Sequence, residues 1–225
     1  MSYTWLLFDA DDTLFDYPLA EGKALRSTFE HFGQVYRSEY LRIYQIFNRQ
    51  VWAEFERGAT TALELRLKRF RLLFDEIGIS LNLQDFSQRY LENLAHTSDL
   101  FPGTAELLQT LTGRYHIALV TNGLKEVQRL RLERSTIRPF IEKIFISEEI
   151  GVAKPAAGFF EAVFQEIGLP LKNQVLIIGD SVTSDMQGGI NYGIDTCWFN
   201  PAGKTTAMPL TYTIRTLGQL LEILR

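Results

Sequence analysis

Five short apolar runs, separated by segments of helical spacing, most restrict the folds that this sequence can adopt. Runs of four to six apolar residues without a polar face are typical of strands buried on both sides of a parallel sheet. Helical spacing lies between or after the later runs, at 105–111, 158–168 and 217–224. Strands that alternate with helices predict an α/β fold, a doubly wound parallel sheet with right-handed crossovers. The five apolar runs cover residues 3–8, 116–120, 143–146, 175–178 and 196–199.

Residues from about 19 to 97 interrupt this alternation with helical spacing alone. Apolar side chains recur there at intervals of three and four in four successive stretches, which predicts a small bundle of four amphipathic helices. The block follows the first strand and ends before the second. We therefore predict an α/β catalytic core of residues 1–16 and 100–225, and an inserted helical cap domain, 17–99, over the end of the first strand. The helical positions are Leu25, Phe29 and Phe32; Tyr40, Tyr44, Phe47, Val51 and Phe55; Leu63, Leu67, Phe70 and Phe74; Leu83, Phe86, Tyr90 and Leu94.

Composition excludes several classes of protein. The net charge of −4 and the lack of a basic tract argue against a nucleic-acid partner, and the apolar stretches are too short to span a bilayer. Cys197 is the only cysteine, so no intrachain disulfide can form and a reducing cytoplasm is the expected location. We expect a cytoplasmic monomer or small homo-oligomer.

Three aspartates stand directly after the first predicted strand. Asp9 and Asp11 are two residues apart, so in extended geometry their side chains lean the same way, and Asp12 follows them. Carboxylates at the end of a buried strand are costly to desolvate and need a compensating charge such as a metal ion. The arrangement suits one carboxylate as nucleophile and a second as proton-transfer group.

Polar groups also follow three later strands. Thr121 and Asn122 precede a glycine after the second strand, Lys154 stands in the loop after the third, and Asp180 and Asp185 follow the fourth. In open α/β sheets, ligands bind outside the carboxyl ends of the strands. These groups suit a phosphate or a divalent metal.

Each of these residues also has a purely structural interpretation. Thr121 could be a turn hydroxyl, Lys154 a solvated loop lysine, and Asp180 the cap of a following helix. Four such coincidences at successive strand ends are very improbable by chance, and this favours the functional interpretation of the set.

Together these motifs resemble the four motifs of the haloacid-dehalogenase-like superfamily, and the helical block resembles that superfamily's cap. The resemblance extends over essentially the whole chain. The motifs that carry it are Asp9-x-Asp11-x-Thr13, Thr121 before Asn122-Gly123, Lys154-Pro155, and Gly179-Asp180-Ser181 with Asp185.

The resemblance implies roles for these residues. Asp9 would attack phosphorus and form an aspartyl-phosphate, and Asp11 would protonate the leaving oxygen and then deprotonate water. Thr121, Asn122 and Lys154 would bind the phosphate oxygens.

The resemblance also implies a metal. A hard divalent cation, Mg²⁺ with Mn²⁺ as a substitute, would lie between Asp9, the backbone carbonyl of Asp11, and Asp180. Asp185 would be a further ligand or an anchor behind the site. Dehalogenases of the superfamily attack carbon and do not need the second aspartate, so Asp11 favours phosphate-ester hydrolysis.

Further stretches resemble the pyrimidine 5′-nucleotidase subfamily. That resemblance implies a small-molecule phosphate ester as substrate, a nucleoside monophosphate such as dUMP, UMP or dTMP. Two alternatives remain open: a phosphatase or mutase acting on a sugar phosphate or another small phosphometabolite, and a binding or regulatory module on a catalytic fold. The stretches are residues 8–15, 55–61, 130–135, 146–155 and 188–191.

Aromatic and amide side chains of the helical block and of the linker before it are candidates to contact a base. They are Phe15 and Tyr17 near its start and Asn48 and Trp52 one helical turn apart. Aromatics at helical spacing also suit a packed core, so both interpretations stay open for Trp52.

Overall fold

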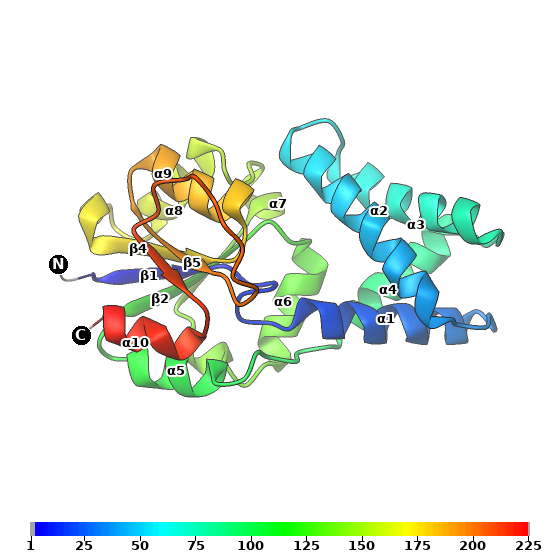
Figure 1. The fold of residues 1–225 in the computed structure, drawn as a ribbon, viewed down its shortest axis with the longest axis horizontal. Coiled ribbons are helices and arrows are strands. Elements are labelled where there is room, and N and C mark those ends of the chain that lie inside the picture. The colour runs from blue at the N-terminus through cyan, green and yellow to red at the C-terminus, as the bar shows by residue number, and fades with distance from the viewer. Residues whose placement is uncertain (1–2, 225) are drawn as a thin grey trace. The chain divides into compact units, whose positions relative to one another are not determined.

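A parallel β-sheet with helices on both faces and a bundle of four longer helices make up the chain (Figure 1). The computed structural model describes residues 3–224. Two compact units divide the chain between them. The α/β unit comprises Met1–Tyr17, Asp99–Lys125 and Leu132–Arg225, and the helical unit comprises Pro18–Ser98 and Glu126–Arg131.

The sheet has six strands in the order β3-β2-β1-β4-β5-β6, and every neighbouring pair is parallel. The predicted fold class is therefore confirmed. The sequence order of the strands reverses at β1, which has β2 on one side and β4 on the other, and ligands of such sheets bind at this reversal. The strands are β1 (Trp5–Phe8), β2 (His116–Thr121), β3 (Lys143–Ile146), β4 (Val175–Gly179), β5 (Asp195–Phe199) and β6 (Tyr212–Ile214).

Alternate residues of β1 face the two cores of the α/β unit. Leu6 and Phe8 pack in one core, against apolar residues of α5 and α10, and Leu7 packs in the other, against α8. In Figure 1, α5 and α10 lie on one face of the sheet, and α8 and α9 lie on the other. Burial on both faces explains why the predicted strands read as continuous apolar runs.

The helices of the α/β unit follow its strands. Short 3₁₀ segments, η1 (Arg138–Phe140), η2 (Lys172–Gln174) and η4 (Leu217–Gln219), and one π-helical turn, η3 (Val182–Met186), complete it. None of the helices within residues 3–224 has both the length and the apolar character needed to cross a membrane. The α-helices are α5 (Thr104–Leu111), α6 (Lys125–Arg134), α7 (Ser147–Ile150), α8 (Ala157–Glu166), α9 (Gln187–Tyr192) and α10 (Leu220–Ile223). Of these, α6 is divided, since its residues Glu126–Arg131 belong to the helical unit.

Two glycines of α9 allow this helix to pack closely in the α/β unit. A Cβ at Gly188 would meet the ring of Phe160 at 2.6 Å, and one at Gly189 would meet the side chain of Thr196 at 2.6 Å. Because neither neighbour is the end of a long flexible chain, any larger residue would push the helix away from its neighbours.

Aromatic side chains fill the core of the helical unit. Tyr44, Phe70 and Phe86 are fully buried, with Phe70 stacked on Tyr44 at 5.3 Å and edge-on to Phe86 at 5.2 Å between ring centroids. These residues belong to the helical spacing seen in the sequence. The helices are α1 (Tyr17–His31), α2 (Ser38–Glu56), α3 (Ala62–Ile77) and α4 (Leu83–Ala95).

Local sequence signals set both ends of α3. The Thr61 hydroxyl accepts a hydrogen bond from the backbone N–H of Glu64, and the Glu64 carboxylate accepts one from the N–H of Thr61. This reciprocal pair satisfies two backbone donors at the start of the helix. Gly78 ends it with φ of 70°, in the left-handed region that glycine adopts without strain.

A buried polar group links three helices of this unit. The Asn48 amide donates to the Glu21 carboxylate at 2.9 Å and accepts from the Arg69 guanidinium at 3.1 Å. All three residues are at least 95% buried. Burial raises the pKa of Glu21 to about 6, although hydrogen bonds from Gln45 and Asn48 and the charge of Arg69 oppose the rise.

Glu21 therefore makes the stability of the helical unit depend on pH. Its pKa is higher in the folded state than its ordinary value of 4.5, so the folded state binds the proton more tightly. The resulting stabilisation, about 2 kcal/mol, is complete below pH 4.5 and is lost as the pH rises through 6. We expect chemical denaturation at pH 4.5 and pH 7 to show this loss relative to a Glu21→Gln variant. An identical pH dependence of the two proteins would contradict it.

Candidate active site

The carboxyl ends of β1 and β4 bring two predicted aspartates to the same edge of the sheet. Asp9 follows β1, and its N–H donates to the carbonyl of Ile178 at 2.8 Å, which continues the β1–β4 pairing by one residue. Asp180 follows Gly179, the last residue of β4. Parallel strands end at one edge, so adjacency of β1 and β4 places the two carboxylates together.

Lys154 is the centre of this edge. Its ammonium group donates to Asp9 Oδ1 at 2.8 Å, to Asp185 Oδ1 at 2.6 Å and to the carbonyl oxygen of Val120 at 2.8 Å. The side chain is 99% buried. Burial acts to lower the pKa of Lys154, but the carboxylates of Asp185 and Asp9 outweigh burial and raise it. Lys154 is therefore a buried, charged residue and not a solvated loop lysine.

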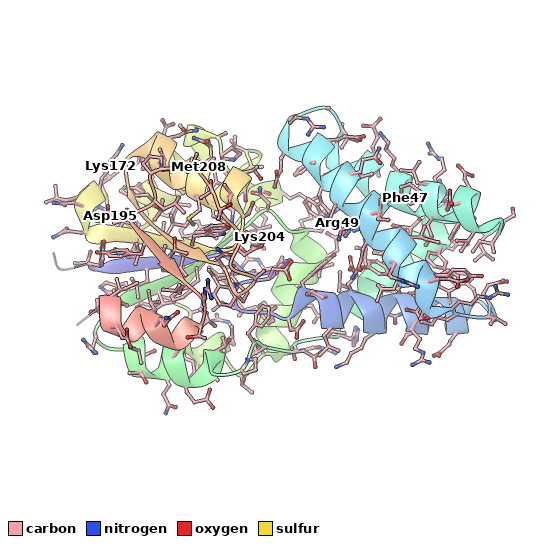
Figure 2. All side chains as sticks on the ribbon, viewed as in Figure 1. Phe47, Arg49, Lys172, Asp195, Lys204 and Met208 are labelled. Carbon is pink, nitrogen blue, oxygen red and sulfur yellow. The ribbon has the colours of Figure 1, made fainter. Side chains whose placement is uncertain are left out.

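Asn122 holds the main chain of Lys154. Its amide N–H donates to the Lys154 carbonyl and its amide oxygen accepts from the Lys154 N–H, each at 2.9 Å. Asn200, which follows β5, makes the same pair of bonds to the main chain of Lys204. Figure 2 shows Lys204 and Asp195, which begins β5, at opposite ends of the sheet. The Asn122 side chain is thus engaged in holding the main chain of Lys154.

Thr121 is the last residue of β2 and is 98% buried. Its hydroxyl oxygen accepts a hydrogen bond from the N–H of Gly123 at 3.0 Å, which forms a tight turn after the strand. A hydroxyl that accepts one bond keeps its own proton for another acceptor. The turn interpretation and a phosphate-binding role are therefore compatible at this residue.

Asp185 lies in the π-helical turn η3, and both of its carboxylate oxygens have partners. Oδ1 accepts from Lys154, and Oδ2 accepts from the N–H of Ser181 at 3.1 Å. A Cβ on Gly179 would lie 2.3 Å from Asp185 Oδ2, so only glycine allows this approach. Of the two roles expected for Asp185, ligand or anchor, this geometry favours the anchor.

The acidic residues of this edge fit a divalent cation. Ligand oxygens of Asp9, Asp180 and Asp185 lie within 4.8 Å of one another. Burial raises the pKa of Asp9 and of Asp180, and repulsion from the neighbouring carboxylates raises both further. Two buried carboxylates and the half-buried one of Asp180 share one ammonium group, and oxygen ligands with excess negative charge are those that Mg²⁺ prefers. The donor set therefore suits the metal that the sequence predicts.

The turn after β1 places Asp11 and Asp12 differently. Asp11 is half-buried and its charge acts on the carboxyl of Asp9. Asp12 has φ of 61°, in the left-handed region, and its N–H donates to the carbonyl of Phe15. Thr13 donates its hydroxyl proton to Asp9 Oδ2 at 3.2 Å. Asp12 is thus a turn residue.

Sequence reasoning assigned no role to three residues that contact this edge. Thr13 is in the first motif, and its spacing of four from Asp9 was a usable signal. Ser181 contributes a backbone N–H to Asp185, four residues further on, and Trp198 contributes an indole N–H whose contact with Asp180 depends on the adjacency of β4 and β5. Short-range patterns carry no information on that adjacency.

The candidate base-contacting residues differ in burial. Phe15 is fully buried in a core of the α/β unit, and Asn48 is bonded to Glu21 and Arg69 inside the helical unit. Tyr17 and Trp52 are half-buried. Tyr17 and Trp52 therefore keep exposed ring surface, whereas Phe15 and Asn48 are used in packing.

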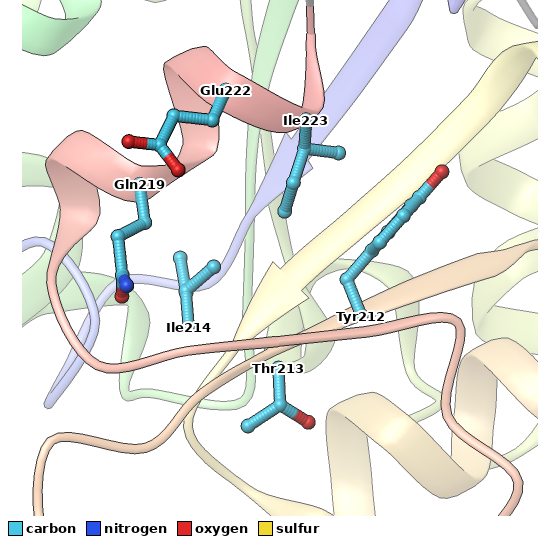
Figure 3. A pocket seen from close by; sticks show the side chains of 6 residues that line it. All are labelled: Tyr212, Thr213, Ile214, Gln219, Glu222 and Ile223. Atoms are coloured by element: carbon cyan, nitrogen blue, oxygen red, sulfur yellow. The ribbon is translucent and has the colours of Figure 1, made fainter.

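A hollow of about 190 Å³ lies beside β6 and the helices after it (Figure 3). Its lining holds one charged residue, Glu222. It shares no residue with the acidic edge, by which we mean Asp9, Asp180 and Asp185 with Lys154. A lone carboxylate repels a phosphate, so the hollow lacks the chemistry of the predicted site. The lining residues are Tyr212, Thr213, Ile214, Gln219, Glu222 and Ile223.

Comparison with known proteins agrees with this geometry. The model of the haloacid dehalogenase-like hydrolase family matches residues 6–199, which include every residue of the acidic edge. The chain belongs to this family. This match confirms the predicted family. It also confirms the prediction that the protein is an enzyme of the hydrolase class.

Full-length relatives have named activities within the family. The chain is 32% identical to the pyrimidine 5′-nucleotidase YjjG of Escherichia coli, with 100% of the chain and 99% of that protein covered. It is 37% identical to the pyrimidine 5′-nucleotidase PynA of Streptococcus pneumoniae, with 100% and 96% covered. The predicted class, a phosphoric monoester hydrolase, agrees with both.

A solved structure in the family is similar over its whole length. The crystal structure of the HAD-hydrolase YfnB from Bacillus subtilis has a TM-score of 0.94 and 37% identity, with 100% of both chains covered. That protein was crystallised bound to magnesium, and its domains move relative to one another.

Removal of Lys154 tests the electrostatic description of the edge. A Lys154→Met variant keeps a long side chain but leaves Asp9 and Asp185 buried without their shared cation. We expect it to lower the free energy of unfolding by about 3 kcal/mol, measured by guanidinium titration. Lys68→Met, which removes a partly exposed pair with Glu54, should lower it much less, because solvent screens that pair. If both variants lost the same small amount of unfolding free energy, this electrostatic description would be wrong.

Proposed function

We propose that this protein is a Mg²⁺-dependent phosphatase that hydrolyses pyrimidine nucleoside 5′-monophosphates such as dUMP, UMP and dTMP. One observation carries the reaction: Asp9 stands at the carboxyl end of a central strand, bonded to Lys154, with Asp180 beside it and Asp11 two residues on. Two full-length relatives named as pyrimidine 5′-nucleotidases support the substrate.

Asp9 is the proposed nucleophile. One carboxylate oxygen attacks phosphorus, an aspartyl-phosphate forms, and the bond from phosphorus to the ester oxygen breaks. Lys154 and the Thr13 hydroxyl hold the two oxygens of Asp9, which fixes the direction of attack. Asp9 is 8% exposed, so little solvent competes at this position.

Asp11 is the proposed acid and base. It gives a proton to the leaving ester oxygen, which departs as the 5′-hydroxyl of the nucleoside. Water then attacks the phosphorus of the aspartyl-phosphate and Asp11 takes the proton of that water, which releases phosphate and restores both residues. Asp11 thus gives one proton to the departing nucleoside and regains another from water within one cycle.

Three residues bind and place the phosphate in this proposal. Thr121 donates its hydroxyl proton to a phosphate oxygen, and Lys154 supplies positive charge where negative charge develops. Asn122 acts on Lys154, because its amide is bonded to the lysine main chain.

The metal would be held by Asp9, Asp180 and the backbone carbonyl of Asp11, with Asp185 behind them. When bound, Mg²⁺ offsets the charge of the carboxylates and of the phosphate and polarises the phosphoryl group. Substrate choice is assigned to the helical unit as a cap domain and to the segment that leads into it, with Trp52 of the helical unit and Tyr17 of the α/β unit as the residues that keep ring surface for a base.

Phosphate release from a panel of phosphate esters tests the proposal. We expect phosphate to be released faster from UMP, dUMP and dTMP than from AMP, GMP and ribose 5-phosphate. EDTA should abolish turnover until Mg²⁺ is restored. Asp9→Asn should lower kcat at least about a thousandfold, because an amide cannot replace the nucleophile.

Asp12→Asn is a matched control for this variant. It makes the same chemical change three residues away, and asparagine tolerates the left-handed backbone at this position. Its activity should stay within about threefold of the unaltered protein. Metal-independent turnover that survives Asp9→Asn would refute the mechanism, and a strong preference for a sugar phosphate would refute only the substrate.

A further inference from the structure

The indole of Trp198 contacts the backbone beside the acidic edge. Its Nε1–H donates to the carbonyl oxygen of Asp180 at 2.8 Å, and the residue is 4% exposed. Trp198 pairs with Gly179 in the β4–β5 ladder. The side chain therefore reaches from the neighbouring strand to the first residue beyond the end of β4.

The peptide group between Asp180 and Ser181 is held on both sides. The indole of Trp198 binds its carbonyl oxygen, and Asp185 Oδ2 accepts from its N–H at 3.1 Å. Because the peptide is planar, these two bonds fix its orientation and thereby ψ of Asp180 and φ of Ser181. Asp185 is itself bonded to Lys154, so this orientation is tied to the centre of the site.

These two hydrogen bonds oppose the repulsion between the carboxylate of Asp180 and its neighbouring carboxylates. Asp180 lies just beyond the paired part of β4, and the charges of Asp9 and Asp185 act on it. Because the pairing of β4 with β5 ends at Gly179, rotation of the next peptide would relieve the repulsion by moving the carboxylate away. A donor on the carbonyl and an acceptor on the N–H both resist that rotation.

We propose that Trp198 is a positioning residue for Asp180, which holds this carboxylate beside Asp9 in the arrangement that binds a divalent cation. The inference rests on the proposed function, because it takes Asp180 as a metal ligand. A site that is in the binding arrangement only part of the time has a correspondingly weaker apparent affinity. Loss of a contact behind a metal ligand typically weakens affinity 10- to 100-fold.

Direct measurement of metal affinity tests this role without relying on turnover. Trp198→Phe removes the indole N–H and keeps a buried aromatic ring. We expect isothermal titration of the metal-free, full-length variant with Mg²⁺ to show a Kd about tenfold higher than that of the unaltered protein.

Trp5→Phe is the matched control, since it makes the same substitution at the start of β1, where Trp5 stacks on His116 with ring centroids 4.8 Å apart. Its Kd for Mg²⁺ should be unchanged. A Trp198→Phe variant that binds Mg²⁺ as tightly as the unaltered protein would overturn the inference and leave the proposed function intact.

A reporter variant keeps the test decisive if Trp198→Phe fails to fold. The chain has three tryptophans, so Trp5→Phe combined with Trp52→Phe leaves Trp198 as the only one. We expect its emission to change on addition of Mg²⁺ and to saturate with the calorimetric binding curve. Constant emission during measured binding would overturn the inference. An unaltered protein that binds no Mg²⁺ yet releases phosphate would overturn the metal requirement of the proposed function.

Discussion

The rest of the site depends on one buried contact, the ammonium group of Lys154 between the carboxylates of Asp9 and Asp185. Removing an ammonium group from water costs several kcal/mol, and this cost is offset only if every N–H finds a partner. Lys154 has three donors and three acceptors, the third being the carbonyl of Val120 on β2. One side chain thereby connects the ends of three adjacent strands, and the Asn122 amide fixes the main chain from which it extends.

That contact neutralises only part of the charge at the edge. Asp180 remains close to Asp9 and Asp185, and burial and repulsion raise its pKa. The protein holds these carboxylates together through its backbone: a glycine at 179 admits Asp185, and the Asp180–Ser181 peptide is bonded on both sides. Carboxylates held in this way attract a cation without having to be reorganised when it arrives, which is the usual basis of electrostatic catalysis.

Much of the fold followed from local patterns. The five predicted strands and the four helices of 17–99 are present because each is longer than a turn and buries a continuous face. Other elements were missed. Helix α6 carries six charged residues in ten and shows little apolar periodicity, and β6 has three residues at the edge of the sheet. The lengths of α7 and α9, four and six residues, are too short for a period of 3.6 to be recognised.

The sequence by itself determined which groups follow the strands: a carboxylate pair after the first, a hydroxyl and an amide after the second, a lysine after the third, and two more carboxylates after the fourth. These follow from residue identity and from the burial that continuous apolar runs require. Only the tertiary structure decided how they divide the work. The strand order puts β1 between β2 and β4, which gives Lys154 two carboxylates to neutralise and makes Asn122 a support for that lysine. It also puts β5 beside β4, which brings Trp198 to the carbonyl of Asp180. Contacts between residues 18 to 145 positions apart depend on strand adjacency, which no local pattern encodes.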